Sequence, residues 1–116
     1  MGAFVISKRF NGEYKFVFTS RKGKVIFTSN SYPDKSLCEA DIMLVKDKAT
    51  RESFNCAKAA GGKYFFKLYI NEVQMALSRK YTTELLMKKG IDEIINSGSK
   101  SEVLDFSETE SIFSEM

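Results

Sequence analysis

The sequence has no histidine and no tryptophan, and it has one proline and two cysteines among 116 residues. Without histidine the chain lacks the commonest general base and the usual partner of a nucleophilic serine or cysteine. Cys38 and Cys56 form no Cys-x-x-Cys pair, which argues against a zinc or haem site and against a disulfide framework. No glycine-rich loop has the spacing that cradles phosphate. We therefore predict that the protein is not an enzyme, with no catalytic residues, no bound metal and no cofactor.

Long apolar runs are also missing. No stretch approaches the roughly 20 apolar residues of a membrane span, and the first residues lack the apolar segment and cleavage site of a signal peptide. We expect a cytoplasmic protein that does not contact a membrane. The net charge of +3 is unevenly distributed, because residues 107–116 carry three glutamates and no basic residue. We predict that this acidic end is a flexible tail, and whether Ile112 and Phe113 dock on the body is left open.

The chain does contain an internal repeat. The segment Gly12–Phe16 returns fifty residues later as Gly62–Phe66, and Ser29–Tyr32 returns as Ser78–Tyr81. In the first copy, alternating apolar residues predict strands over 4–7, 14–19 and 25–29. In the second copy they predict a weaker strand over 54–57, a strand that begins at 64, and strands over 73–78 and 102–106. Two apolar stripes at helical spacing follow the third strand of each copy, namely Cys38, Ile42 and Val45, and Met87, Ile91 and Ile94.

These patterns predict an α+β fold made of two tandem β-β-β-α(-β) repeats, at about 2–51 and 52–106, within a single domain over residues 1–106. One repeat of this size buries too little surface to be stable alone, so we expect both to share one antiparallel sheet with both helices on one face. The trailing strands can be exchanged between repeats, within one chain or between two. Because both copies are in one chain we predict a monomer, while an exposed sheet edge leaves a strand-exchanged dimer open.

The motifs of the first copy resemble those of the YegP-like family, small bacterial proteins of unknown function. They are Phe4-Val5-Ile6, Asn11-Gly12, Tyr14-Lys15-Phe16, Gly23-Lys24-Val25-Ile26, Thr28-Ser29, Tyr32-Pro33-Asp34-Lys35 and Glu39-Ala40-Asp41-Ile42. The second copy matches less well, although Gly90-Ile91 keeps the helical Gly-Ile of the family where Asp41-Ile42 departs from it. The likeness covers about residues 2–106. It implies the fold and no activity, and it supplies no catalytic or ligand-binding residues.

The sheet face without helices is where we expect function. Its outward row mixes polar, aliphatic and aromatic residues, namely Lys15, Val17, Thr19, Phe65, Lys67 and Tyr69. Exposed aromatic residues beside lysines are typical of recognition surfaces, which predicts a binding or interaction module for a protein partner. The same residues also fit simple cross-strand pairs that stabilise a half-solvated sheet.

Single-stranded nucleic acid is the alternative ligand, since bases stack on aromatic rings and lysines follow the phosphates. The candidate contacts for an anion or nucleic acid are Lys15, Arg21, Lys22, Lys24, Lys67 and Tyr69. The basic turn Arg21–Lys24 is equally consistent with an ordinary solvated turn, and no RNA-recognition signature or Gly-x-x-Gly clamp accompanies it. The sequence alone indicates neither a biological role nor a ligand.

Overall fold

The structure is a computed structural model that describes residues 2–107. Its strands are β1 (Ala3–Lys8), β2 (Tyr14–Thr19), β3 (Val25–Ser29), β4 (Phe54–Lys58), β5 (Tyr64–Ile70), β6 (Val73–Ser78) and β7 (Glu102–Asp105). Its α-helices are α1 (Lys35–Lys48) and α2 (Glu84–Ser97), and three short 3₁₀ turns are η1 (Arg51–Ser53), η2 (Ala60–Gly62) and η3 (Gly98–Lys100). Ser107 is described and buried, whereas the rest of the predicted acidic tail, 108–116, lies outside the described residues.

The seven strands form one sheet in the order β4-β5-β6-β3-β2-β1-β7. Hairpins join β1, β2 and β3 and join β4, β5 and β6, and the antiparallel pair β3–β6 connects the two groups. The sheet is nevertheless mixed, because β7 runs parallel to β1. The prediction of a wholly antiparallel sheet is therefore wrong. The two parallel strands come from opposite ends of the described residues, and α2 connects β7 to β6, which runs in the opposite direction.

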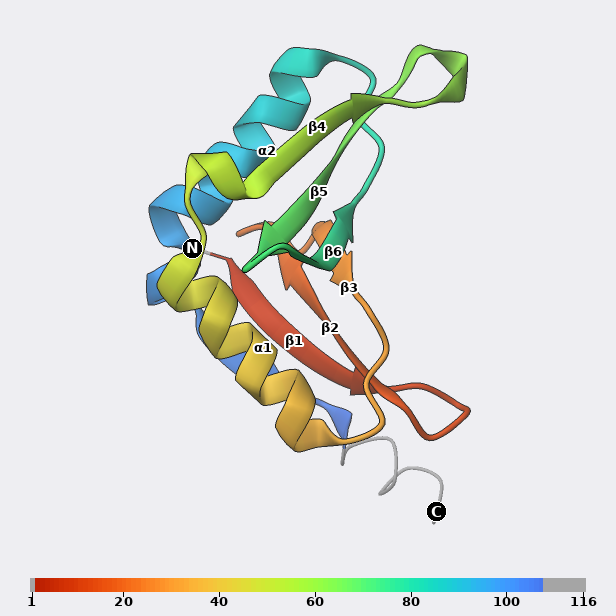
Figure 1. Cartoon of the computed structure of the whole chain (residues 1–116), viewed down its shortest axis with the longest axis vertical. Coiled ribbons are helices and arrows are strands. Elements are labelled where there is room, and N and C mark those ends of the chain that lie inside the picture. Colours follow the sequence, from red (N-terminus) through yellow and green to blue (C-terminus); the bar gives the residue numbers. More distant parts are fainter. Residues whose placement is uncertain (1, 108–116) are drawn as a thin grey trace.

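Both helices cover the same face of the sheet, α1 over the half that contains β2 and α2 over the half that contains β5 (Figure 1). Each helix directs one stripe of side chains at the sheet, and every residue of the two predicted stripes is buried. The stripes are Cys38, Ile42 and Val45 on α1 and Met87, Ile91 and Ile94 on α2. The 3.6-residue period thus accounts for the layer of helices.

Phenylalanine rings fill the space between α1 and the sheet. Phe4, Phe16, Phe18 and Phe27 are all fully buried, and the ring centroids of Phe4 and Phe18 lie 4.9 Å apart. Burying one such ring contributes roughly 1.5–3 kcal/mol. The α2 half has fewer rings, with Phe54 packed edge-on against Phe66 at 5.2 Å.

Each half contains a bulge at the corresponding place. The register shifts between Phe18 and Thr19 on β2 and between Leu68 and Tyr69 on β5, so that the partner strand carries one extra residue. As a result two successive residues are buried on that partner strand, Ile26-Phe27 on β3 and Met75-Ala76 on β6. A bulge bends and twists its strand, and here it adds an apolar side chain to the core.

Many contacts occur twice, at residue numbers that differ by fifty before the β2–β3 turn and by one fewer after it. The Ser29 hydroxyl accepts from the Phe16 amide at 2.8 Å, and the Ser78 hydroxyl accepts from the Phe66 amide at 2.8 Å. Isolated bridges likewise join Tyr14 to Tyr32 and Tyr64 to Tyr81. We call two residues related by this offset counterparts.

Candidate interaction surface

The face of the sheet opposite the helices, called the open face below, is built by strand alternation. On β2, Phe16 and Phe18 point to the helices, so Lys15, Val17 and Thr19 point the other way. The strand registers then place one central row across the open face: Asn55, Lys67, Leu77, Thr28, Val17, Val5 and Leu104. The outward direction predicted for Val17 and Lys67 follows directly from this register.

The open face is apolar at its centre and mixed around it. Val5 and Val17 are half-buried by their neighbours, whereas Leu77 is 45% exposed. On β5 the half-buried Phe65 and Tyr69 flank Lys67 at a spacing of two residues. The row thus offers an apolar strip, made of Leu77, Val17 and Val5 and interrupted by Thr28, with Lys67 and two aromatic side chains at its β5 end.

The structure divides the predicted contact residues into two groups. The first group, Lys15, Lys67 and Tyr69, lies on the open face, but β3 and β6 separate Lys15 from the other two. At about 4.8 Å between neighbouring strands, this separation is about 14 Å. These three side chains therefore share a face without forming one cluster.

The second group, Arg21, Lys22 and Lys24, lies on the exposed β2–β3 turn, at the end of β2 away from Lys15. The turn docks against α2, where the backbone N–H of Arg21 donates to Glu93 Oε2 at 3.2 Å. This basic turn is thus separate from the lysines of the open face.

A small cavity of about 150 Å³ opens where the turn meets α2; its lining residues are Ser20, Lys24, Ile26, Arg79, Tyr81, Lys89, Gly90 and Glu93. The guanidinium carbon of Arg79 lies 5.5 Å from the Tyr81 ring centroid, within cation–π range. Gly90 makes room for the Tyr81 side chain, because a Cβ on Gly90 would lie 2.5 Å from the Tyr81 hydroxyl oxygen. Burial raises the pKa of Tyr81, against an opposing effect of Arg79. We did not predict this cavity from the sequence, although Gly90 at the counterpart position of Asp41 signals it.

The same place in the first half is built differently. There the Tyr32 hydroxyl donates to Asp41 Oδ2 at 2.6 Å, and Tyr32 is only 9% exposed. Burial, and then the hydrogen bond and charge of Asp41, raise the pKa of Tyr32 far above its usual range. The two halves therefore share a backbone but differ in polarity at this point.

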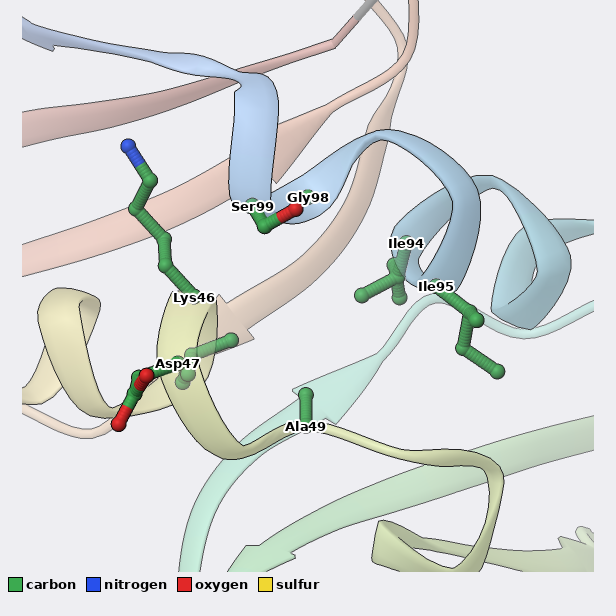
Figure 2. A pocket seen from close by; sticks show the side chains of 8 residues that line it. Lys46, Asp47, Ala49, Ile94, Ile95, Gly98 and Ser99 are labelled. Carbon is green, nitrogen blue, oxygen red and sulfur yellow. The ribbon is translucent and has the colours of Figure 1, made fainter.

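A second cavity lies where the C-terminal ends of the helices meet, and its volume is about 230 Å³. Figure 2 shows Ala49 and Ile94 pointing into this space, while Lys46 points away from it. Lys46 Nζ instead donates to the Ser101 carbonyl at 2.8 Å. This cavity lies between counterparts such as Val45 and Ile94, and Asp47 and Ser99 also line it.

The cysteines do not combine with other ligands. Cys38 is fully buried, and burial followed by the negative charge of Asp41 raises its pKa to about 12. Cys56 is exposed on β4. Within residues 2–107, no group of three or more cysteine, aspartate or glutamate side chains could hold a metal ion. Over the same range, neither helix is long and apolar enough to cross a membrane.

Comparison with known proteins gives a consistent match. The family model described as a domain of unknown function (DUF1508) matches residues 11–53, from the first hairpin turn to η1. The UPF0339 protein plu2779 of Photorhabdus laumondii is 30% identical over 112 residues, which are 95% of this chain and 98% of the relative. The solution structure of yegP from E. coli, a protein of unknown function, superposes with a TM-score of 0.84 at 28% identity, covering 91% of this chain and 93% of that one. The resemblance to YegP-like proteins is confirmed.

Proposed function

The chain belongs to the UPF0339 family of proteins of unknown function, and from this premise we propose that it is a non-enzymatic module that binds a protein partner on the open face. The apolar strip at the centre of that face carries the proposal. Leu77 is 45% exposed between Lys67 and Thr28 in the central row, and the half-buried Val17 and Val5 continue the row beyond Thr28. Phe65 and Tyr69 lie on β5 on either side of Lys67. An apolar centre with a mixed rim is the usual composition of a protein interface.

The experiment compares two charge substitutions by crosslinking in the native cell extract. Leu77→Lys places a charge on the strip, whereas Leu85→Lys places one on α2, at a residue that is 64% exposed. A photocrosslinker at Thr28, next to Leu77 in the register, reports contact with the face. A defined protein that crosslinks to wild type and to the Leu85 variant but not to the Leu77 variant supports the proposal. Equal crosslinking to all three, or none to wild type, overturns it.

Single-stranded nucleic acid is the second candidate ligand, and a row of three side chains on β5 favours it. Phe65, Lys67 and Tyr69 point to the same face at intervals of roughly 6.7 Å, twice the rise per strand residue. Two rings with a cation between them can stack bases and contact the phosphate between them. A labelled oligonucleotide titrated at low and moderate salt tests this, with Lys67→Glu against Lys100→Glu as control. No binding at low salt removes the candidate.

We further propose that the chain is a tandem repeat whose trailing strands are exchanged within one molecule, and that it acts as a cytoplasmic monomer. The duplicated contacts support the repeat. The exchange is supported by the strands that follow the helices, since β4 pairs with β5 and β7 pairs with β1. Light scattering at several concentrations tests the monomer, and a dimer that persists on dilution would place the exchange between molecules.

A further inference from the structure

The two edges of the sheet are not equivalent. Beyond β1 lies β7, where the Phe106 amide donates to the Ile6 carbonyl at 2.9 Å and Ile6 is fully buried. Beyond β4, the counterpart of β1, no strand lies within residues 2–107. The counterpart of Ile6 is Cys56, which is exposed, as are all residues from Asn55 to Lys58. The position that corresponds to β7 is therefore empty beside β4.

A cavity of about 290 Å³ lies at this empty position; it is lined by Cys56, Ala57, Lys58, Tyr64, Glu84 and Met87. Their counterparts in the first half are Ile6, Ser7, Lys8, Tyr14, Lys35 and Cys38. In that half the end of β7 occupies the corresponding space, with Asp105 Oδ2 2.9 Å from Lys35 Nζ and Ser107 only 3% exposed. In the first half, the groove that corresponds to this cavity is thus filled by the end of a strand of the same chain.

The charge at the bottom of the groove is reversed. Asp105 meets Lys35, and burial of Asp105 is outweighed by hydrogen bonds from Ser107 and Lys35, which hold the pKa of Asp105 below its usual range. The counterpart of Lys35 is Glu84. In a segment paired with β4, an acidic side chain in the position of Asp105 would therefore meet the Glu84 carboxylate at the start of α2. Lys88 contacts Glu84 at 3.3 Å, but both side chains are 60% exposed, so an incoming cation can replace this weak bridge.

From these observations we propose that β4 is the acceptor edge for an extended segment of another protein. The segment pairs with β4 in parallel, as β7 does with β1. It presents an apolar residue towards Met87 and, two residues later, a lysine or arginine beside Glu84. Main-chain hydrogen bonds supply the attachment and the groove supplies the selectivity, as in other cases of strand addition. This inference concerns the sheet edge and does not depend on the open face.

The described part of the chain, residues 2–107, does not supply this segment. Its β7 is already paired with β1 at the opposite edge of the sheet, six strand spacings or about 29 Å away. Residues 107–116 contain three glutamates and no basic residue, so in a second copy they would carry the wrong charge for Glu84. Two β4 strands related by a twofold axis would pair antiparallel, which does not reproduce the β1–β7 arrangement.

The test uses two peptides and the full chain. The first peptide has the sequence of residues 101–107, and the second carries lysine at the position of Asp105. We expect the lysine peptide to shift the amide resonances of Phe54–Lys58 with an affinity about two- to five-fold above that of the native peptide, the size of effect expected for one exposed ion pair. Glu84→Lys should invert this preference, and Glu39→Lys, at an exposed site on α1, should leave it unchanged.

Three results would overturn the proposal. One is that neither peptide shifts the β4 resonances at millimolar concentration. Another is that both peptides bind equally and the Glu84 variant changes nothing, which removes the assigned chemistry. The third is that the β4 resonances shift on concentrating the protein alone and neither peptide competes, which makes a second copy the occupant.

Discussion

The two tyrosines at the strand-to-helix junctions allow one hydrogen bond to be measured against an internal control. Tyr32 and Tyr81 are counterparts with the same bridge to a β-strand, but only the Tyr32 hydroxyl has a hydrogen-bond partner among the described residues. Tyr32→Phe removes this bond to Asp41, and Tyr81→Phe removes a hydroxyl that lines a small cavity. We expect the first substitution to destabilise the protein more than the second.

The size of the difference follows from the surroundings of the bond. Hydrogen bonds to charged groups contribute about 1.5–3 kcal/mol to stability, and neutral ones about 0.5–1.5 kcal/mol. Tyr32 is 9% exposed, but Asp41 is partly exposed, so water can replace the lost hydroxyl at the carboxylate. We therefore expect Tyr32→Phe to lower the free energy of unfolding by about 1–2 kcal/mol. For Tyr81→Phe we expect a loss below about 0.5 kcal/mol, as for a solvated hydroxyl.

Urea unfolding followed by far-UV circular dichroism measures both variants without relying on tyrosine fluorescence. A difference of 1 kcal/mol corresponds to about 4–6 °C in Tm for a domain of this size, so thermal scans give a second reading. The double variant should show additive losses, because the two sites share no partner. Equal losses for Tyr32→Phe and Tyr81→Phe would refute the reasoning, and so would a larger loss for Tyr81→Phe.

Three further outcomes are expected. Gly90→Ala should lower the free energy of unfolding, because its Cβ would lie 2.5 Å from the Tyr81 hydroxyl oxygen, and this clash outweighs the helix preference of alanine of about 1 kcal/mol. Adding Tyr81→Phe should recover part of the loss, and a Gly90→Ala protein that is more stable than wild type would contradict this reasoning. Asp105→Asn should destabilise the protein at neutral pH, because the hydrogen bonds from Ser107 and Lys35 stabilise the ionised carboxylate and lower the pKa of Asp105. Its difference from wild type in urea titrations should shrink as the pH falls from about 4 through that lowered pKa. Ellman's reagent should modify only Cys56 in the folded protein and should reach Cys38 only after unfolding, since Cys38 is buried and has a pKa of about 12. Two rapidly reacting thiols in the folded protein would contradict the structure.

Local periodicity predicted most of the elements and the layer of helices. Strand alternation placed Phe16 and Phe18 in the core, and the helical stripes placed Ile42 and Ile91 there. These predictions succeed because burial of one face imposes the period directly on the sequence. The same alternation placed Lys15 on the open face.

The direction of β7 was not predictable in this way. A period of two indicates a strand and its buried face, but it is the same for parallel and antiparallel neighbours. The bulges were missed for a related reason, since Ile26 and Met75 break the alternation and look like ordinary apolar residues in the sequence.

The candidate site was predicted only in part. Lys15 and Lys67 share a face because alternation fixes their direction, yet their separation depends on a strand order that no local pattern encodes. Arg21 and Lys24 were grouped with them on charge alone, whereas the turn docks on α2 through the Arg21 backbone amide and Glu93, far away in sequence. Contacts of this kind become visible only in the folded chain.

The pairing of the last strand with the first has a consequence for biosynthesis. During translation β1 leaves the ribosome before the two helices, and β7 leaves it after them. The nascent chain can form its hairpins early, because they are local, but the β1–β7 contact joins Ala3 to Glu102 and must wait. The N-terminal half therefore gains its last strand only after β7 has been synthesised, and chains that stop after α2 should depend on chaperones and be degraded more rapidly than chains that include β7.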